Sequence, residues 1–255
     1  MILARITHEV SSRYNPRPVE NAVDELFELA VVIPTLNEEG AIEACLESVG
    51  EHSGVEIVVS DGGSTDATRA LASRRAVRVV VGESGRGPQL NRGAEAASAE
   101  RLLFLHADCR LPEGWRDAVI GALGDPETAL ACFRLHTEPS RGGESSVLHR
   151  SWPRILDLRS RSFGLPYGDQ AYAVSRDVFE LVGGFSEIPL MEDFAFARAC
   201  RRLGRIRRLP MEVRTTARRF ERHPVRTRLM TATFPTLFRL GVSPFTLARW
   251  YREVR

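Results

Sequence analysis

Short apolar runs alternate with amphipathic segments through the first half of the chain, and this alternation constrains the fold more than any other feature. The runs cover residues 29–33, 55–59, 77–81, 101–105 and 129–135. Their length and continuous hydrophobicity predict buried β-strands. The intervening segments have apolar residues at helical spacing and predict helices at 39–49, 66–73, 89–99 and 115–123. Apolar strands joined by helices predict an α/β fold with a parallel sheet covered on both faces.

The pattern loosens after His136. Predicted helices cover residues 145–160, 176–182, 192–203, 224–240 and 244–254, and the last two are amphipathic. Short strands are predicted at 171–174 and at 211–215, the second as an edge strand. We therefore expect an N-terminal extension over 1–28 and one domain over 29–255. Within that domain, residues 29–136 form one half and residues 137–255 the other.

Composition and charge exclude several classes of protein. A net charge of +2 does not indicate a nucleic-acid-binding protein, although all 35 basic residues are arginine. No run of 18 apolar residues exists, and residues 1–28 lack the apolar stretch of a signal peptide. The cysteines are not spaced like zinc ligands, which favours small core residues in a reducing compartment; they are Cys45, Cys109, Cys132 and Cys200. A cytoplasmic protein is expected, with contact at the inner face of the membrane left open.

Polar turns follow the first four predicted strands. They span residues 34–39, 60–66, 82–91 and 105–108. Ligands of parallel sheets bind at the carboxyl ends of the strands, so these turns predict a binding site at one edge of the sheet. Each turn taken alone also fits an ordinary capped connection between a strand and a helix.

The residue types in these turns suit a nucleotide and a cation. Asp61 is placed to accept hydrogen bonds from a base or ribose, and Gly62 allows the backbone to approach a ligand closely. Arg86 adds a permanent charge to a glycine-rich turn that opens a helix, which favours an anion. Asp108 is placed to hold Mg²⁺ or Mn²⁺ through oxygen, with His106 as a second ligand or a hydrogen-bond partner.

An acidic pair opens the predicted helix at 192–203. Glu192 and Asp193 would be favoured there by the helix dipole without any function. The functional alternative is a general base that removes a proton from a hydroxyl group.

Together these motifs resemble glycosyltransferase family 2, in particular a group of small soluble bacterial members with the GT-A fold. The motifs are V-V-I-P-T-L-N-E-E (31–39), I-V-V-S-D-G-G-S-T-D (57–66), G-R-G-P-Q-L-N-R-G (85–93), L-H-A-D (105–108), G-D-Q (168–170), V-G-G-F (182–185) and M-E-D (191–193). The resemblance covers about residues 29 to 220. It implies a Rossmann-like, mostly parallel sheet flanked by helices, and the transfer of a sugar from a nucleotide-sugar donor, usually UDP-linked, to an acceptor hydroxyl.

The resemblance also implies roles for single residues. The nucleotide and its phosphates would be met by Pro34, Thr35, Asn37, Glu38, Asp61, Gly62, Arg86, Asn91 and His106. Asp108 matches the last acid of the family's D-x-D motif and would hold the metal. Asp193 matches the general base of inverting members. The acceptor site would be shaped by Gly168, Asp169, Gln170 and Glu192.

Two departures from the family pattern bear on these roles. His106 replaces the first acid of D-x-D, which leaves one certain carboxylate for the metal. The Q-x-x-R-W motif of processive members appears only as residues 216–220, where Arg219 and Phe220 match its last two positions. The missing glutamine favours transfer of a single sugar over polymer synthesis, and Arg219 could still bind phosphate.

Residues 198–228 hold 12 arginines against Glu212 and Glu221. This basic segment could be a solvated face, could contact anionic lipid head groups through the helix that follows, or could bind the donor diphosphate. RNA binding is disfavoured because aromatic platforms for bases are absent from it. Two other functions remain open for the whole chain: a sugar nucleotidyltransferase, and a module that binds a nucleotide-sugar or a membrane without catalysis.

Overall fold

In the computed structural model of the chain, residues 27–75, 77–138, 165–216 and 224–252 are described. Eight strands form one sheet in the order β3-β2-β1-β4-β7-β6-β8-β5. The strands are β1 (Leu29–Thr35), β2 (Val55–Asp61), β3 (Arg78–Val81), β4 (Arg101–Phe104), β5 (Cys109–Arg110), β6 (Thr128–Glu138), β7 (Tyr172–Ser175) and β8 (Arg205–Thr216). Both predicted halves of the chain contribute strands to this sheet.

The parallel part of the sheet matches the expectation from the apolar runs. β1 pairs in parallel with β2 and β4, and β2 pairs in parallel with β3. The fifth predicted strand, residues 129–135, lies within β6 but does not pair with β4. β7 lies between them and is antiparallel to both. The apolar pattern predicts that a strand is buried, but it does not say which strand lies beside it.

The predicted edge strand at 211–215 was wrong in its length and its position. These residues are the end of β8, which begins at Arg205 and pairs with both β6 and β5. The edge position belongs to the two-residue strand β5. The start of β8 was missed because it is rich in arginine and lacks a continuous apolar run. Its outward positions are charged, whereas Leu209 and Val213 are buried.

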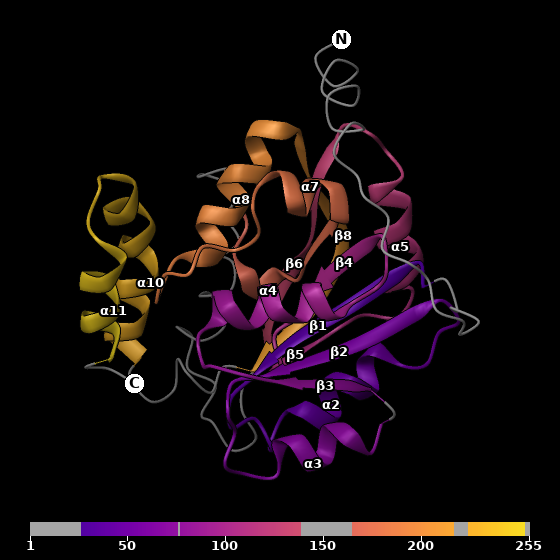
Figure 1. Cartoon of the computed structure of the whole chain (residues 1–255). Helices are drawn as coiled ribbons and strands as arrows, with labels where there is room; N and C mark the ends of the chain where they lie inside the picture. Colours follow the sequence, from indigo (N-terminus) through magenta and orange to yellow (C-terminus); the bar gives the residue numbers. More distant parts are fainter. Residues whose placement is uncertain (1–26, 76, 139–164, 217–223, 253–255) are drawn as a thin grey trace.

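Helices cover both faces of the sheet, as predicted (Figure 1). They are α2 (Ile42–Val49), α3 (Thr68–Ser73), α4 (Arg86–Ala96), α5 (Trp115–Leu123), α7 (Arg176–Leu181), α8 (Glu192–Leu203), α10 (Pro224–Arg239) and α11 (Pro244–Arg252). Alternate residues of β1 separate the two cores. Ala30 and Val32 pack toward α4 and α8, while Val31 and Ile33 pack toward α2 and α5. The predicted helix at 145–160 lies outside the described residues.

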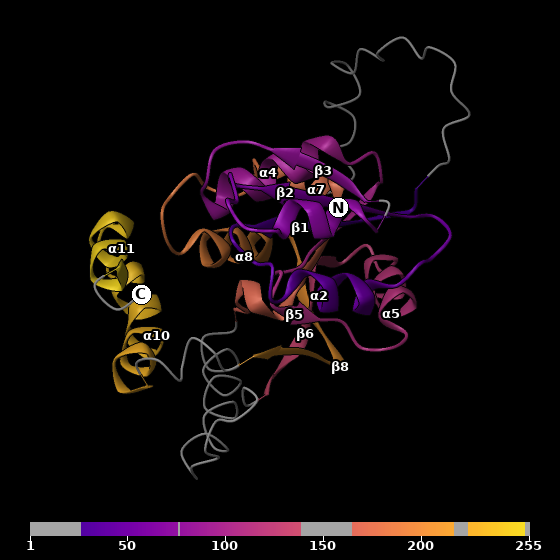
Figure 2. The ribbon, with the colours of Figure 1, turned by 90° about the horizontal axis from the view of Figure 1, so that it is seen from below.

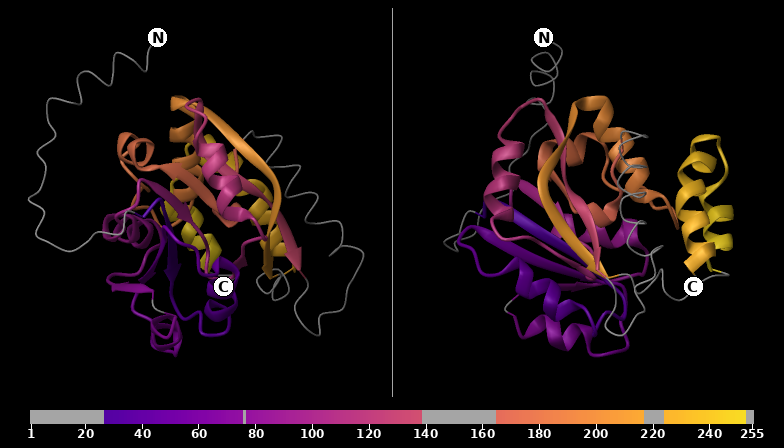
Figure 3. Two further views of the ribbon diagram at one scale, coloured as in Figure 1. Left: turned by 90° about the vertical axis from the view of Figure 1, so that its right-hand side faces the viewer. Right: turned by 180° about the vertical axis from the view of Figure 1, so that it is seen from behind.

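The two C-terminal helices stand beside α8, at the end of the molecule away from α5 (Figures 1, 2 and 3). Phe238 of α10 meets Phe194 of α8 edge to face, with ring centroids 6.2 Å apart. Leu247 of α11 is fully buried in the same core. Among the described helices, none combines the length and the apolar character needed to cross a membrane.

Candidate active site

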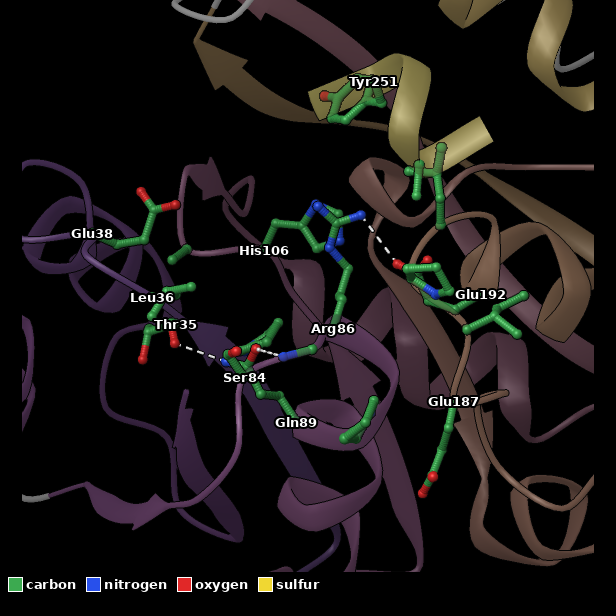
Figure 4. A pocket seen from close by; sticks show the side chains of 18 of the residues that line it. Thr35, Leu36, Glu38, Ser84, Arg86, Gln89, His106, Glu187, Glu192 and Tyr251 are labelled. Carbon is green, nitrogen blue, oxygen red and sulfur yellow. Dashed lines mark hydrogen bonds and ion pairs between the residues drawn. The ribbon is translucent and has the colours of Figure 1, made fainter. Parts of the chain in front are cut away.

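A cavity of about 520 Å³ opens where β1 and β4 end, within the usual size of a small-molecule site. Its walls come from the turn after β1, the start of α4, the turn after β4, residues 187–190 and helix α11. Seven of the residues predicted from sequence line it: Pro34, Thr35, Glu38, Arg86, His106, Asp108 and Glu192. Figure 4 shows Arg86 between the Thr35 side and the Glu192 side of the cavity, with Tyr251 of α11 nearby.

Asp61 lies behind this wall. Its side chain is fully buried and it is not among the described residues that line the cavity. The carboxylate accepts hydrogen bonds from Thr35 Oγ1 at 3.0 Å, from the backbone N–H groups of Gly63 and Ser64, and from Ser64 Oγ. Burial raises the pKa of Asp61, but these hydrogen bonds outweigh it and the net shift is downward. Asp61 therefore holds Thr35, which does line the cavity.

Asn37 and Gly62 are likewise not among the described residues that line the cavity. Both pack against neighbouring turns instead. Asn37 has a positive φ of 55° and is exposed. Its backbone N–H donates to Ser64 Oγ at 2.9 Å, and its Oδ1 accepts from the Thr65 N–H at 2.9 Å. A Cβ atom at Gly62 would lie only 3.0 Å from the Gln89 side chain, so close packing favours glycine there.

Gln89 is a site residue that sequence reasoning did not select. Its buried amide donates to the carbonyl groups of Thr35 at 2.7 Å and Ser60 at 3.0 Å, and its Oε1 accepts from the Gly85 N–H. These bonds tie the end of β1 and the end of β2 to the start of α4. The only feature of the sequence that could have indicated this role is the position of a polar residue on the inner face of a predicted helix.

Asn91, predicted to meet the nucleotide, binds another loop. Its amide donates to the Phe185 carbonyl at 2.9 Å and accepts from the Phe185 N–H at 2.8 Å. It is not among the described residues that line the cavity. The V-G-G-F motif is thus anchored to α4 through this side chain.

An ion pair crosses the cavity. Arg86 Nη1 lies 3.1 Å from Glu192 Oε1, and the side chains are 33% and 2% exposed. Burial raises the pKa of Glu192 above its ordinary 4.5, and neighbouring Asp193 adds to this, while Arg86 opposes it. Burial of Arg86 lowers its pKa, but Glu192 and Asp193 outweigh this and the net shift is upward. The cation is therefore permanent.

We expect Glu192→Gln to change how stability depends on pH. Because the folded-state pKa of Glu192 lies above 4.5, the folded protein binds this proton more tightly than the unfolded chain does. The resulting stabilisation is present below that ordinary pKa and is lost as the pH rises through the folded-state value. The free energy of unfolding of the variant should therefore rise relative to the native protein as the pH increases from 4.5 through the raised folded-state pKa of Glu192. Urea unfolding across this range measures it, and a flat difference contradicts the raised pKa.

The turn after β4 carries His106 and Asp108. Together with Cys109 they place one imidazole nitrogen, one carboxylate oxygen and one sulfur within 4.8 Å of one another. Burial raises the pKa of Cys109 well above 9.0. A carboxylate oxygen at the carboxyl end of a strand suits the hard divalent cation implied by the resemblance, so the residues present fit a metal ion.

Asp193 lies beside this turn but is not among the described residues that line the cavity. Its Oδ2 accepts the Gly168 N–H at 2.8 Å. A Cβ atom at Gly168 would lie 3.1 Å from His106 Nε2 and 3.3 Å from Asp193 Oδ2, so both side chains lie against this one glycine. His106 and Asp193, which are 87 residues apart in the sequence, are thus brought to one glycine.

The G-D-Q turn is the 3₁₀ helix η1 (Gly168–Gln170). Gln170 is buried and donates to the Phe133 carbonyl at 3.1 Å, so its side chain holds the turn on β6. The Asp169 carbonyl lies 3.7 Å from Cys109 Sγ, which connects the turn to the residues after β4. None of these three residues is among the described residues that line the cavity.

Helix α11 closes one side of the cavity with Phe245, Ala248 and Tyr251. The sequence predicted this helix but gave no reason to place it at the site. Arg219, predicted to bind phosphate, lies outside the described residues.

Comparisons with known proteins identify the family of this chain. The family model "Glycosyl transferase family 2" matches residues 30–183. A PGL/p-HBAD biosynthesis glycosyltransferase of Mycobacterium bovis is 30% identical over 185 residues, which cover 67% of this chain and 68% of that protein.

Two solved structures share the fold. A mannosyltransferase from Pyrobaculum calidifontis, in complex with GDP-Man and Mn²⁺, has a TM-score of 0.60 at 20% identity over 99% of this chain and 76% of its own. Glucosyl-3-phosphoglycerate synthase from Mycobacterium tuberculosis, in complex with Mn²⁺, UDP and glucosyl-3-phosphoglycerate, has a TM-score of 0.50 at 25% identity over 73% and 70%. The family match over more than half of the chain, the related enzyme and the shared GT-A fold lead to one conclusion: this chain belongs to glycosyl transferase family 2 and is a glycosyltransferase.

Proposed function

We propose that the enzyme transfers one sugar from a nucleotide-diphosphate sugar, UDP-linked, to an acceptor hydroxyl, with inversion and with Mg²⁺ or Mn²⁺. The observation that carries the proposal is the approach of His106 and Asp193 to the same glycine beside a cavity that also holds Asp108 and Arg86. A candidate cation ligand and a candidate phosphate ligand on the wall of one cavity, with a candidate base beside it, support the proposal. The two solved structures with bound nucleotide and Mn²⁺ support the substrate class.

The donor would lie along the β1 side of the cavity. Pro34, Thr35 and Glu38 would contact the nucleotide, with Asp61 orienting the Thr35 hydroxyl from behind. Direct contact of Asp61 with the base would require one of its four hydrogen bonds to be exchanged. Arg86 would meet the diphosphate, because a permanent guanidinium suits phosphate oxygens.

Asp108 would hold the metal ion, which would supply electrostatic stabilisation to the departing diphosphate. Asp193 would accept the proton of the acceptor hydroxyl, whose oxygen then attacks the anomeric carbon from the face opposite the nucleotide. Glu192 would hold Arg86 in place across the cavity. Gly168, Asp169 and Gln170 would shape the acceptor side by fixing the loop against Asp193.

Thermal unfolding with nucleotides tests the donor class. We expect UDP or a UDP-sugar with Mn²⁺ to raise the melting temperature, because a ligand bound only to the folded state stabilises it by about 2.7 kcal/mol at one hundred times its Kd. GDP and ADP serve as the matched comparison. Product analysis then separates sugar transfer from nucleotidyl transfer, which would release pyrophosphate, and from binding without catalysis, which would yield no product.

We also propose that the protein is cytoplasmic and contacts the membrane through its Arg-rich C-terminal region. Large apolar side chains are exposed on or beside α10 and α11, namely Leu229, Leu240, Phe245 and Trp250. Arginines and exposed apolar groups on adjacent helices suit an anionic lipid interface. We expect the protein to sediment with anionic vesicles at low salt and to be released as the salt concentration rises. Equal recovery with neutral and anionic vesicles contradicts this contact.

A further inference from the structure

The turn after β4 brings together three donor atoms of different chemistry. The imidazole of His106, the carboxylate of Asp108 and the thiol of Cys109 have ligand atoms within 4.8 Å of one another. Ligand bonds of about 2.0–2.3 Å put two donors on one ion at most about 4.6 Å apart. In a tetrahedral site the donors lie roughly 3.5 Å apart, so a pair at the 4.8 Å limit would have to close by about 1 Å to meet one cation.

The backbone holds these side chains in a fixed arrangement. The Cys109 N–H donates to the His106 carbonyl at 3.0 Å and closes the turn. β5 then pairs with β8, and Thr215 Oγ1 lies 3.4 Å from the Asp108 carbonyl. The Asp169 carbonyl lies 3.7 Å from the Cys109 sulfur. The cluster thus sits between two ordered elements rather than on a free loop.

We propose that His106, Asp108 and Cys109 form a mixed nitrogen, oxygen and sulfur site that binds a divalent transition-metal ion in preference to Mg²⁺. The inference rests on the proposed function only in assigning the bound ion to the donor diphosphate. Mg²⁺ selects oxygen ligands in octahedral geometry, whereas imidazole and thiolate suit ions such as Co²⁺ and Zn²⁺. The histidine at the first acid position of D-x-D is then an exchange of ligand type rather than a loss.

Three protein ligands leave open positions on the ion, as substrate-binding metal sites require. A thiol that coordinates a divalent cation gives up its proton to the solvent. Cys109 is 1% exposed, so its sulfur would bind the ion from the protein side. His106 and Asp108 line the cavity, so an ion that they held would be accessible from it.

The absorption spectrum of bound Co²⁺ depends on its ligands and can be measured without a sugar donor. We expect the full-length protein titrated with Co²⁺ to develop thiolate-to-cobalt charge-transfer absorption in the near ultraviolet. Cys109→Ser should abolish that absorption and weaken Co²⁺ binding by at least the order of 10–100-fold that loss of supporting partners costs metal sites. Cys45→Ser is the matched control, because Cys45 is also buried and its thiol lies 3.6 Å from the His106 carbonyl, yet it is outside the cluster. This control should keep the absorption.

Two further results decide the proposal without depending on one variant. In the native protein, Mg²⁺ should displace Co²⁺ only in large excess. His106→Asp, which creates a D-x-D sequence, should shift the preference toward Mg²⁺ and retain the sulfur absorption. Displacement by equimolar Mg²⁺, cobalt binding without a sulfur band, or a band that survives Cys109→Ser would overturn the inference. None of these outcomes bears on whether sugar transfer occurs, which product analysis tests separately.

Discussion

Replacing Asp193 with asparagine is expected to lower the turnover number about 10²–10⁴-fold, the range typical of a positioned general base. The amide is nearly isosteric and its oxygen can still accept the Gly168 N–H that Asp193 Oδ2 accepts at 2.8 Å. Donor binding should therefore be kept, because the lost function is proton removal from the acceptor. Steady-state kinetics at several donor concentrations separate the two effects.

Asp177→Asn is the matched control for this variant. Asp177 is also in the first turn of a helix, α7, but it is exposed and lies outside the described cavity wall. Its replacement should leave turnover unchanged. Unchanged turnover in Asp193→Asn itself would remove this residue from the mechanism. The next candidate for the base would be the adjacent residue Glu192, which lines the cavity.

Replacing Asp108 with asparagine is expected to lower turnover by about 10²–10³-fold and to raise the metal concentration needed for half-maximal activity. A bound cation contributes several kcal/mol to the stabilisation of developing charge, and each 1.4 kcal/mol or so corresponds to about tenfold in rate. Asp108 is the only carboxylate in the cluster of three possible ligands among the described residues. Its replacement removes the negative charge that attracts the ion.

Removal of the metal ion with a chelator tests the same metal dependence without a substitution. EDTA should stop sugar transfer by the native protein, and added Mn²⁺ or Mg²⁺ should restore it. For the Asp108→Asn variant, the control for a general loss of negative charge is Asp117→Asn. The Asp117 side chain is 86% exposed on α5. Full activity in chelator would assign Asp108 a different role.

Much of the fold was visible in the sequence because burial and periodicity are local properties. Helices α5 and α8 begin and end at the predicted residues, and β1, β2 and β4 lie within two residues of the predicted bounds. The four polar turns also follow the strands as expected. The family resemblance then connected these turns to a glycosyltransferase.

Other features depended on distant partners. β7 enters the sheet between β4 and β6 because its buried residues find antiparallel partners there, and no local pattern in residues 172–175 specifies them. The same holds for Gln89 and α11. The polar residue Gln89 and the amphipathic pattern of α11 can be recognised in the sequence. Their partners, the ends of β1 and β2 for Gln89 and the cavity for α11, come from other parts of the chain.

The order of helices and strands along the chain, the burial of β1 and β4 and the chemical types in the turns could be predicted from sequence, since these depend on residues within a few positions of one another. The predicted burial of β3 was wrong, because both ends of this strand are exposed. Only the tertiary structure decided which turns meet. It placed Asp61 behind Thr35, set Arg86 against Glu192, and brought His106 and Asp193 to Gly168. The physical reason is that sheet pairing and helix packing fix distances between residues far apart in the chain, such as Arg86 and Glu192 at 106 positions, and these distances decide which side chains can act together.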